Sequence, residues 1–229
     1  MFDSLGDRMK NNYENRYRIY LTRRTPVILR LDGKAFHTIT RSCEKPFDQQ
    51  FAVSMDIAAE KLVEQIQGAK LAYVQSDEIS ILLIDFDRLT TEAWFDYNLQ
   101  KIVSVASGMA STYFSHYFKK ICCFDCRAFN IPKEEVCNYF IWRQNDWVRN
   151  SVQMLAQAHY SHKELHGKGQ SEMHEMLYQK NINWADLPNR FKNGFTYIKT
   201  DEIGWNCRDN LIFTKEREAI NNLLIPIEE

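Results

Sequence analysis

Two acidic residues, Asp32 and Asp77, stand where the chain has its clearest potential for chemistry. Asp32 lies in RLDGKAFH (30–37), at the end of the apolar run PVILRL, and Asp77 lies in QSDEIS (75–80), between two further apolar runs. In both segments a carboxylate stands where a strand is expected to stop. Two carboxylates that meet at strand ends can hold divalent metal ions, and such ions handle phosphate groups.

The elements that must position these carboxylates follow the order strand, helix, strand, strand, helix, strand. Short apolar runs predict strands, and apolar residues three and four apart predict helices. The predicted elements are a strand over Pro26–Leu31, a helix over Phe47–Ile66, strands over Leu71–Val74 and Ile79–Ile84, a helix over Trp94–Phe118 and a strand over Ile121–Ile131. This is the order of the ferredoxin-like βαββαβ unit, so the predicted fold class is α+β.

This topology is expected to bring Asp32 and Asp77 together. The first two strands run parallel, and the third lies between them, antiparallel to both. The end of the first strand and the hairpin between the second and third strands then share one edge of the sheet. Because neighbouring strands lie about 4.8 Å apart, the sequence predicts one site with two carboxylates.

Two carboxylates a few ångströms apart repel each other unless a cation lies between them. Mg²⁺ is usually held by one or two carboxylates together with substrate phosphates. Gly33 has no Cβ, so its backbone can approach such an ion or phosphate closely. Residues 34–37 can present successive backbone N–H groups to a triphosphate. Lys45, in the polar loop before the helix, is a candidate cationic partner for the phosphate tail.

Each acidic segment alone is more often a turn or a solvated hairpin, and only their joint placement favours a metal site. His37 keeps two interpretations, a packed or surface histidine and a member of the site. Four further histidines occupy a polar segment, at His159, His162, His166 and His174. No carboxylate spacing there supports a second metal site. Within the long helix predicted after residue 132, Trp142 is expected in the core, and Arg143 can reach phosphate.

We expect a catalytic core over residues 1–132 and, over residues 133–229, a helical and β extension packed on it. The extension is predicted to hold a helix from Lys133 to about Tyr160, a short helix near Glu172–Tyr178, and strands over Gly194–Lys199 and Leu211–Phe213. An amphipathic helix is predicted over Phe2–Tyr13, with Asp3 or Ser4 near its N-cap.

Composition excludes several classes of protein. The 229 residues are 45% hydrophobic and 26% charged, which is ordinary for a soluble globular protein. The net charge of −1 excludes a generally basic nucleic-acid binder, but not a local basic face. The polar N-terminus and the lack of long apolar stretches predict neither a signal peptide nor a membrane helix. The cysteines are scattered, with only Cys123 and Cys126 in C-x-x-C spacing, which favours free thiols and a cytoplasmic location.

The same segments resemble the tRNA-histidine guanylyltransferase family, and within it the bacterial, archaeal and phage-type "like" branch. The resemblance covers roughly Asp7 to Lys199 and rests on several motifs occurring together in one order. They are RLDGKAFH (30–37), Lys45-Pro46 with Asp48, QSDEIS (75–80), FDCRAFNIP (124–132) and WRQND (142–146).

The resemblance implies a nucleotidyltransferase whose core is similar to the palm domain of 5′–3′ polymerases but works in the reverse direction. A tRNA 5′-monophosphate is activated with ATP or GTP. The 3′-hydroxyl of an incoming nucleoside triphosphate then attacks the activated phosphate. The implied partners are tRNA and nucleoside triphosphates, and the implied assembly is a homotetramer with tRNA spanning subunits.

By the same resemblance, Asp32 and Asp77 bind two Mg²⁺ ions, with the Gly33 carbonyl as a further ligand. Glu78 is an additional essential carboxylate, so the implied catalytic residues are Asp32, Asp77 and Glu78. The implied nucleotide-binding residues are Asp32, Gly33, Lys34, Ala35, Phe36, His37, Lys45, Ser76 and Asp77.

More distant residues complete what the resemblance implies. Asp125 and Arg127 are expected to brace the site from the fourth strand, and Lys180 aligns with a lysine linked to nucleotide or tRNA handling. Eukaryotic members carry an H-I-N-N-L-Y-N run after W-R-Q, whereas this chain has VRNSVQM (148–154), in which only Asn150 matches. This departure favours template-directed repair of 5′-truncated tRNA over dedicated G addition to histidine tRNA. A non-catalytic tRNA-binding protein is the third alternative, which the retained acidic residues disfavour.

Overall fold

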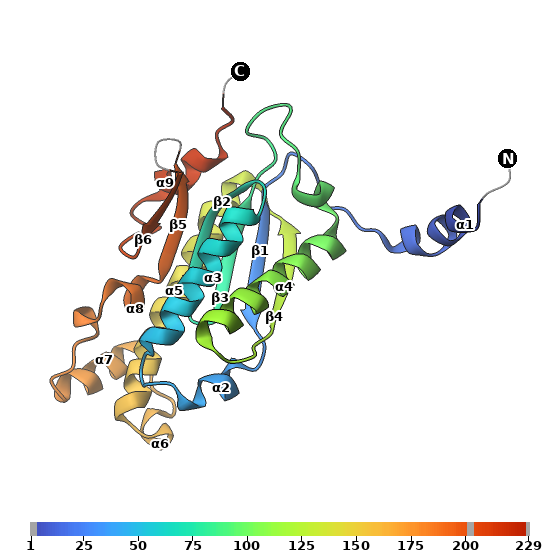
Figure 1. The fold of residues 1–229 in the computed structure, drawn as a ribbon. Helices are drawn as coiled ribbons and strands as arrows, with labels where there is room; N and C mark the ends of the chain where they lie inside the picture. The colour runs from blue at the N-terminus through green and yellow to red at the C-terminus, as the bar shows by residue number, and fades with distance from the viewer. Residues whose placement is uncertain (1–3, 201–203, 228–229) are drawn as a thin grey trace.

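A six-stranded antiparallel sheet forms the centre of the protein (Figure 1). The computed structural model describes residues 4–200 and 204–227. The strand order is β4-β1-β3-β2-β5-β6. The strands span Val27–Gly33 (β1), Ala69–Gln75 (β2), Glu78–Leu83 (β3), Phe124–Asn130 (β4), Phe195–Thr200 (β5) and Gly204–Arg208 (β6). The first four strands confirm the predicted ferredoxin-like order and the α+β class, and β5 and β6 extend the sheet beyond β2.

The helices differ greatly in length. The longer ones are α1 (Leu5–Asn12), α3 (Gln49–Gln65), α4 (Leu99–Phe118), α5 (Lys133–His159) and α7 (Gln170–Gln179). The short ones are α2 (Phe36–Ile39), α6 (His162–Leu165), α8 (Asn189–Asn193) and α9 (Arg217–Asn221). Single 3₁₀ turns are η1 (Glu14–Tyr17), η2 (Thr40–Ser42), η3 (Trp94–Tyr97), η4 (Trp184–Asp186) and η5 (Asn222–Leu224). None of the described helices is long and apolar enough to cross a membrane.

Helices α3 and α4 cover one face of the sheet and α5 lies across the other (Figure 1). Side chains of β1 alternate between the two faces. Leu29 and Leu31 are buried with α3 and α4, whereas Ile28 is buried with α5. The next residues on the α5 face are Arg30 and Asp32, so this face of β1 changes from apolar to charged towards the end of the strand.

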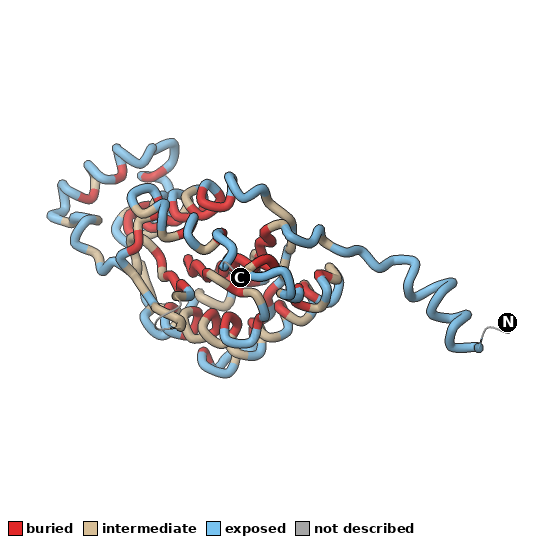
Figure 2. Tube along the Cα trace, turned by 90° about the horizontal axis from the view of Figure 1, so that it is seen from above, coloured by how far each residue is buried: buried red, intermediate tan, exposed pale blue. Residues whose placement is uncertain are grey.

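The N-terminal arm extends away from this body (Figures 1 and 2). As predicted, Ser4 caps α1, because its hydroxyl accepts the Asp7 N–H at 3.1 Å. The other predicted cap residue, Asp3, lies outside the described residues. No residue of α1 is buried, and Leu5 and Tyr13 are 66% and 63% exposed.

The second strand predicted near the C-terminus lies elsewhere. The prediction over Leu211–Phe213 is wrong, because the partner of β5 is β6. Leu211 and Phe213 are instead buried in the core beneath α5, where the Phe213 ring lies 5.2 Å from the ring of Tyr73. A short apolar triplet that is buried by side-chain packing gives the same pattern as a buried strand.

The helix predicted over Trp94–Phe118 is divided. Phe95 and Asp96 adopt left-handed conformations, with φ of +52° each, which separates η3 from α4. The Asn98 side chain then caps α4 by accepting the Lys101 N–H at 3.0 Å. Asparagine is a strong N-cap residue, so the new helix begins there.

Trp142 does not lie in the core as predicted, because it is 53% exposed on α5. The buried stripe of α5 runs through Val136, Phe140, Arg143 and Trp147, at helical spacing, and passes Trp142 by. The charged residue of that stripe is therefore buried and the aromatic residue next to it is not.

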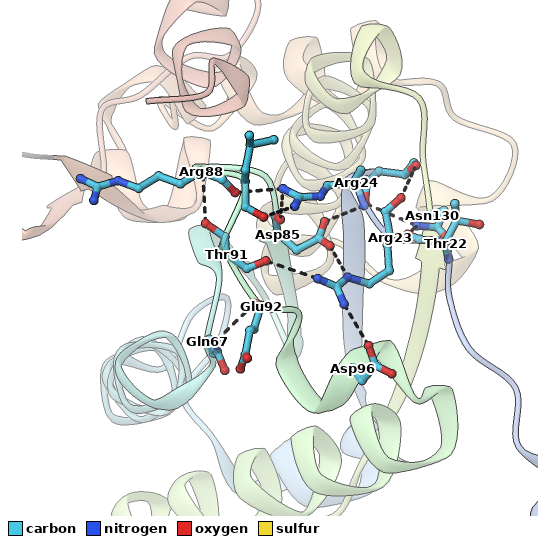
Figure 3. A network of polar contacts seen from close by, with 12 residues as sticks. Thr22, Arg23, Arg24, Gln67, Asp85, Arg88, Thr91, Glu92, Asp96 and Asn130 are labelled. Atoms are coloured by element: carbon cyan, nitrogen blue, oxygen red, sulfur yellow. Dashed lines mark hydrogen bonds and ion pairs between the residues drawn. The ribbon is translucent and has the colours of Figure 1, made fainter. Parts of the chain in front are cut away.

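A buried carboxylate, Asp85, fixes the end of the sheet that lies away from Asp32 (Figure 3). Arg23 Nε donates to its Oδ2 at 2.6 Å, and the Arg24 backbone N–H donates to its Oδ1 at 2.9 Å. The Arg24 guanidinium also donates to the carbonyls of Asp85 and Arg88, at 3.1 and 2.9 Å. These bonds tie the segment before β1 to the chain that leaves β3.

We expect Asp85→Asn to lower the free energy of unfolding by about 1–3 kcal/mol, since it breaks a charge-assisted bond to a fully buried group. Asp96→Asn is the matched control, because Asp96 also binds Arg23 but its side chain is 71% exposed; its effect should stay within about 0.5 kcal/mol. Chemical denaturation measures both. Equal losses from the two variants would contradict this account.

Candidate active site

The end of β1 and the β2–β3 hairpin meet at one edge of the sheet. Asp32 stands opposite Glu78 in the β1–β3 register, and the Gly33 N–H donates to the Asp77 carbonyl at 3.0 Å. Asp32 and Asp77 also line one cavity. The structure therefore brings the two acidic segments together, as their strand order predicts.

Burial and mutual repulsion raise the pKa of both carboxyl groups. For Asp77, burial is the main cause and the charges of Asp32 and Glu78 add to it, which raises the pKa to about 6. For Asp32, burial again contributes most, followed by the charges of Glu78 and Asp125. The ionised pair is thus unfavourable on its own, and a cation between the two groups relieves it.

The loop after β1 has a tightly defined backbone. A Cβ on Gly33 would lie 2.4 Å from the Phe36 ring, so only glycine fits there. Phe36 is itself fixed, because its ring packs 5.1 Å from Phe124 and 5.2 Å from Phe114. Left-handed conformations at Ala35, with φ of +57°, and at Ser76, with φ of +46°, shape the two loops that face each other here.

The predicted row of N–H donors at residues 34–37 is shorter than expected. The Lys34 N–H donates to the Cys123 carbonyl at 2.8 Å, which removes it from any phosphate. Phe36 is buried, and His37 is exposed and lines a cavity. His37 is therefore a surface histidine on the wall of this cavity, and its membership of the site stays a prediction.

A cavity of about 410 Å³ opens between this loop, the start of α3, the hairpin and α8. Lys45 lies on its wall, with Nζ donating to the Thr40 carbonyl at 3.3 Å. Phe47 and Phe191 form an apolar wall, with stacked rings 4.6 Å apart. An aromatic wall with a lysine nearby suits a ligand with a flat ring and negative charge.

A second cavity of about 420 Å³ lies between the hairpin and α5. Its walls are polar and include Arg30 and Asp32 from β1 and Asn150 and Gln153 from α5. The two cavities adjoin, and their shared lining residues are Ser76, Asp77, Trp147 and Met154.

Two buried polar atoms in these linings lack a hydrogen-bond partner within the described part of the chain. They are Gln75 Oε1 and Trp147 Nε1, one an acceptor and the other a donor. Buried polar groups are nearly always satisfied.

Glu78 is enclosed by donors and is 5% exposed. Arg143 Nε and Nη2 donate to its two carboxylate oxygens at 2.7 Å each. Arg30 Nε adds a bond of 2.9 Å to Oε2, and Gln75 and Ser80 donate to Oε1 at 3.1 and 3.2 Å. Glu78 therefore joins β1, β3 and α5 directly beside Asp77.

Arg143, predicted to reach phosphate, lines the second cavity, but carboxylates of its own chain engage it. The residue is 4% exposed, and its guanidinium binds Glu78 and Asp146, whose Oδ2 lies 3.1 Å from Nη2. An arginine on the buried stripe of a helix must find a carboxylate. The place of Arg143 on the buried stripe of α5 therefore indicates an internal ion pair more clearly than the residue type does.

Asp125 and Arg127, predicted to brace the site, are exposed on β4 opposite Asp32 and Arg30. The Asp125 charge contributes to the raised pKa of Asp32, after burial and Glu78, and Arg127 opposes it. Lys180 is outside both cavity linings; its Nζ donates to the His159 carbonyl at 2.7 Å and caps the end of α5.

No group of three or more His, Cys, Asp and Glu side chains that could hold a metal ion occurs within residues 4–200 and 204–227. The four histidines at 159–174 therefore do not gather into such a site there, and the six cysteines are free. Asp32 and Asp77 are a smaller donor set, of the kind that binds Mg²⁺ together with phosphates.

The aromatic part of the site is not predicted from the sequence. Trp147 falls on the α5 face that also carries Arg143, Asn150 and Met154, and this spacing could have identified it. Phe191 carries no such signal, because only the tertiary fold brings α8 to Phe47.

Known proteins resemble the chain over most of its length. A family model described as tRNAHis guanylyltransferase matches residues 6–132. A bacterial tRNA(His) guanylyltransferase-like protein solved in complex with ATP is 45% identical with a TM-score of 0.92, covering 98% of this chain and 100% of that chain. One solved in complex with GTP is 44% identical with a TM-score of 0.87, covering 97% and 99%. A probable tRNA(His) guanylyltransferase of Drosophila melanogaster is 28% identical over 224 residues, which is 89% of this chain and 73% of the relative.

We expect Arg143→Met to destabilise the protein by about 3–5 kcal/mol, because it leaves the Glu78 carboxylate buried with one strong partner removed. Adding Glu78→Gln should recover part of this loss, since the uncompensated charge then disappears. Urea denaturation of the two variants measures the difference. A double variant less stable than Arg143→Met would show that the ion pair does not carry this part of the fold.

Proposed function

Because this chain belongs to the tRNA(His) guanylyltransferase family and is a nucleotidyltransferase, we propose that it adds nucleotides to tRNA 5′ ends in the 3′–5′ direction, as template-directed repair of 5′-truncated tRNA. One observation carries the proposal. Two adjoining cavities, of about 410 and 420 Å³, share Asp77 in their linings, with Asp32 beside it. Joining a nucleotide to an RNA end requires both reactants at one centre.

The first cavity is proposed to take a nucleoside triphosphate. The stacked rings of Phe47 and Phe191 offer an apolar wall to a base, and Lys45 offers a charge to the phosphates. Two similar bacterial proteins were solved with ATP and with GTP, which supports this assignment. The proposed nucleotide-binding residues are Asp32, Gly33, Lys34, Ala35, Phe36, His37, Lys45, Ser76 and Asp77, with Lys34 contributing its exposed side chain because its N–H is bonded to Cys123.

Asp32, Asp77 and the Gly33 carbonyl are proposed to hold two Mg²⁺ ions. The donor set fits, because both carboxylates have raised pKa values in the absence of a cation and offer hard oxygen ligands. When bound, Mg²⁺ polarises the attacking and leaving oxygens of a phosphoryl transfer. The Phe36 ring leaves no room for a side chain at Gly33, whose N–H is bonded to the Asp77 carbonyl at 3.0 Å, so the proposed ligand stands directly beside the hairpin.

Glu78 is proposed to be essential as a positioning residue. Its oxygens are already bonded to Arg143 and Arg30, so it orients the neighbouring Asp77 instead of binding an ion. Glu78 lines the same cavity as Asp32 and Asp77, and its proposed contribution is to hold the start of β3 in place.

The choice of repair rests on residues 148–154. Asn150, Gln153 and Met154 line the second cavity, so the segment that departs from H-I-N-N-L-Y-N lies at the site itself. A different lining of the second cavity is proposed to change which RNA binds there, while the acidic residues that carry the chemistry are retained. Dedicated G addition to histidine tRNA is the alternative enzyme function, and non-catalytic tRNA binding is the alternative of another class.

The assembly is proposed to be a homotetramer with tRNA spanning subunits. The exposed apolar residues of α1, Leu5 and Met9, are 66% and 42% exposed and leave the arm without a partner in its own described chain. An arm of this kind is commonly covered by another subunit.

The variant Asp77→Asn distinguishes the role of Asp77 in metal binding from its effect on folding stability. The raised pKa of Asp77 means that its charge opposes folding above about pH 6, and this cost disappears as pH falls towards 4. Without metal, the variant should be more stable than the native protein at pH 7 by about 1–2 kcal/mol, and no more stable near pH 4.

With Mg²⁺ and ATP at pH 7, the native protein should gain thermal stability, whereas Asp77→Asn should gain little and lose nucleotide transfer. Asp96→Asn, at the far end of the sheet, is the control and should respond as the native protein does. Full Mg²⁺-dependent stabilisation of Asp77→Asn would refute the assignment of Asp77 as a ligand.

A product assay tests the reaction. Given tRNAs lacking one or two 5′ nucleotides, ATP and all four nucleoside triphosphates, the protein should add template-matched nucleotides to several tRNAs. Addition of G to histidine tRNA alone would favour the alternative enzyme function. Retained tRNA binding without any addition would leave the non-catalytic alternative.

A further inference from the structure

Helix α8 contributes one wall of the first cavity, although it is only five residues long. Arg190 and Phe191 of α8 line this cavity, and the Phe191 ring stacks on Phe47, with 4.6 Å between ring centroids and 9° between ring planes. A single helical turn is not stable by itself, because its few hydrogen bonds do not offset the entropy lost in ordering it. The position of Phe191 must therefore be set by contacts between α8 and the rest of the protein.

An ion pair between Arg190 and Asp56 connects α8 to α3. Arg190 Nε donates to Asp56 Oδ2 at 2.9 Å, and Nη2 donates to Oδ1 at 2.8 Å. The two side chains are only 12% and 14% exposed. An arginine that makes two bonds to one carboxylate fixes the orientation of both groups as well as their distance. Ala52, one turn before Asp56 on α3, lines the cavity, so the pair joins the two helices beside it.

The ion pair stands apart from the acidic centre. Asp56 lies outside the linings of both cavities, and Arg190 directs two of its nitrogens at Asp56. Neither residue belongs to the group formed by Asp32 and Asp77. Because Arg190 is adjacent in sequence to Phe191, the ion pair acts on the cavity through the position of that ring.

The other end of α8 has separate attachments. Tyr73 Oη and Gln144 Nε2 both donate to the Asn193 carbonyl at 2.9 Å. The next residue, Gly194, has a φ of +81°, and a Cβ there would lie 2.5 Å from the Tyr73 ring. These contacts hold the junction of α8 and β5 independently of the ion pair. Loss of the pair is therefore expected to release Phe191 without unfolding the segment.

We propose that Asp56 and Arg190 are positioning residues for the nucleoside triphosphate, because their ion pair holds Phe191 against Phe47 and so sets how tightly the base is bound. The inference rests on the proposed function for the identity of the ligand. Every base has a flat face that an aromatic wall can contact, so the pair affects ATP and GTP alike. It acts on nucleotide binding and leaves the acidic centre unchanged.

Binding of ATP in the absence of RNA tests the inference apart from turnover. Titration calorimetry with Mg²⁺ measures the Kd for ATP of the native protein, of Asp56→Asn, of Phe191→Leu and of the variant that carries both substitutions. Asp87→Asn is the matched control. Asp87 Oδ2 lies 2.7 Å from Lys70 Nζ, with the side chains 22% and 13% exposed, and neither residue lines either cavity.

Asp56→Asn should weaken the binding of ATP and of GTP about tenfold, which is the scale of one stacked base. Phe191→Leu should weaken it similarly, and adding Asp56→Asn to Phe191→Leu should cost little more, because the ion pair acts through that ring. Asp87→Asn should keep the native Kd even where it lowers the melting temperature. In the full reaction, Asp56→Asn should raise the KM for ATP, while kcat at saturating ATP and the KM for tRNA stay unchanged.

A gentler variant covers the case in which Asp56→Asn does not fold. Arg190→Lys keeps the positive charge but not the planar fork that binds both oxygens of Asp56, and it should weaken ATP binding about threefold. Thermal unfolding shows which variants are folded before their Kd values are compared.

Three results would overturn the inference. The first is a native Kd for ATP in folded Asp56→Asn or Arg190→Lys. The second is a full tenfold loss when Asp56→Asn is added to Phe191→Leu, since the pair would then act on the ligand by another route. The third is an equal loss in Asp87→Asn, which would reveal a general effect of lowered stability. Failure of the proposed function has a different signature, because the variants would then follow the expected pattern of ATP binding while the native protein adds no nucleotide to any tRNA.

Discussion

The buried carboxylate of Glu78 is the interaction on which the site depends. Its bonds to Arg143 and Arg30 connect the middle of α5 to β3 and β1, beside the hairpin that carries Asp77. A buried carboxylate is tolerated only when donors surround it. The two arginines are therefore not free to leave, and the hairpin keeps one position relative to the end of β1. Because Arg143 and Arg30 are bonded to Glu78, they offset the charges of Asp32 and Asp77 only in part, and the pKa of both carboxyl groups stays raised, as expected of the proposed metal ligands.

Much of the fold was predictable because local patterns and topology agreed. Apolar runs predict β1, β2 and β3, and the order of the elements alone predicts that Asp32 lies beside the hairpin. Only one topological step was needed, since strands one and three are neighbours in the ferredoxin-like order. The functional roles of the residues needed the family resemblance as well, because two carboxylates at a sheet edge do not specify RNA.

The remaining features of the site could not be predicted from the sequence, because they depend on which side of each helix or strand packs against the rest of the protein. Arg143 and Trp142 are adjacent on α5, and hydrophobicity alone assigns them to the wrong sides. The structure buries the arginine to satisfy Glu78 and exposes the tryptophan. Leu211 and Phe213 were also assigned wrongly from the sequence, because apolar residues buried under α5 have the same sequence pattern as a short buried strand. Phe47 and Phe191 meet only through tertiary packing, for which sequence spacing offers no clue.

A rigid hairpin has a further consequence for a reaction in two steps. The two cavities share Ser76 and Asp77, so the same hairpin forms a wall for both substrates of the proposed transfer. If it moved with each substrate, the activated phosphate would lose its position before the second attack, and misplacement by about 1 Å is costly in rate. The bonds of Glu78 to Arg143 and Arg30 tie the hairpin to α5 and β1 and oppose such a movement. In the proposed transfer, the two substrates therefore bind in separate cavities on either side of one acidic centre.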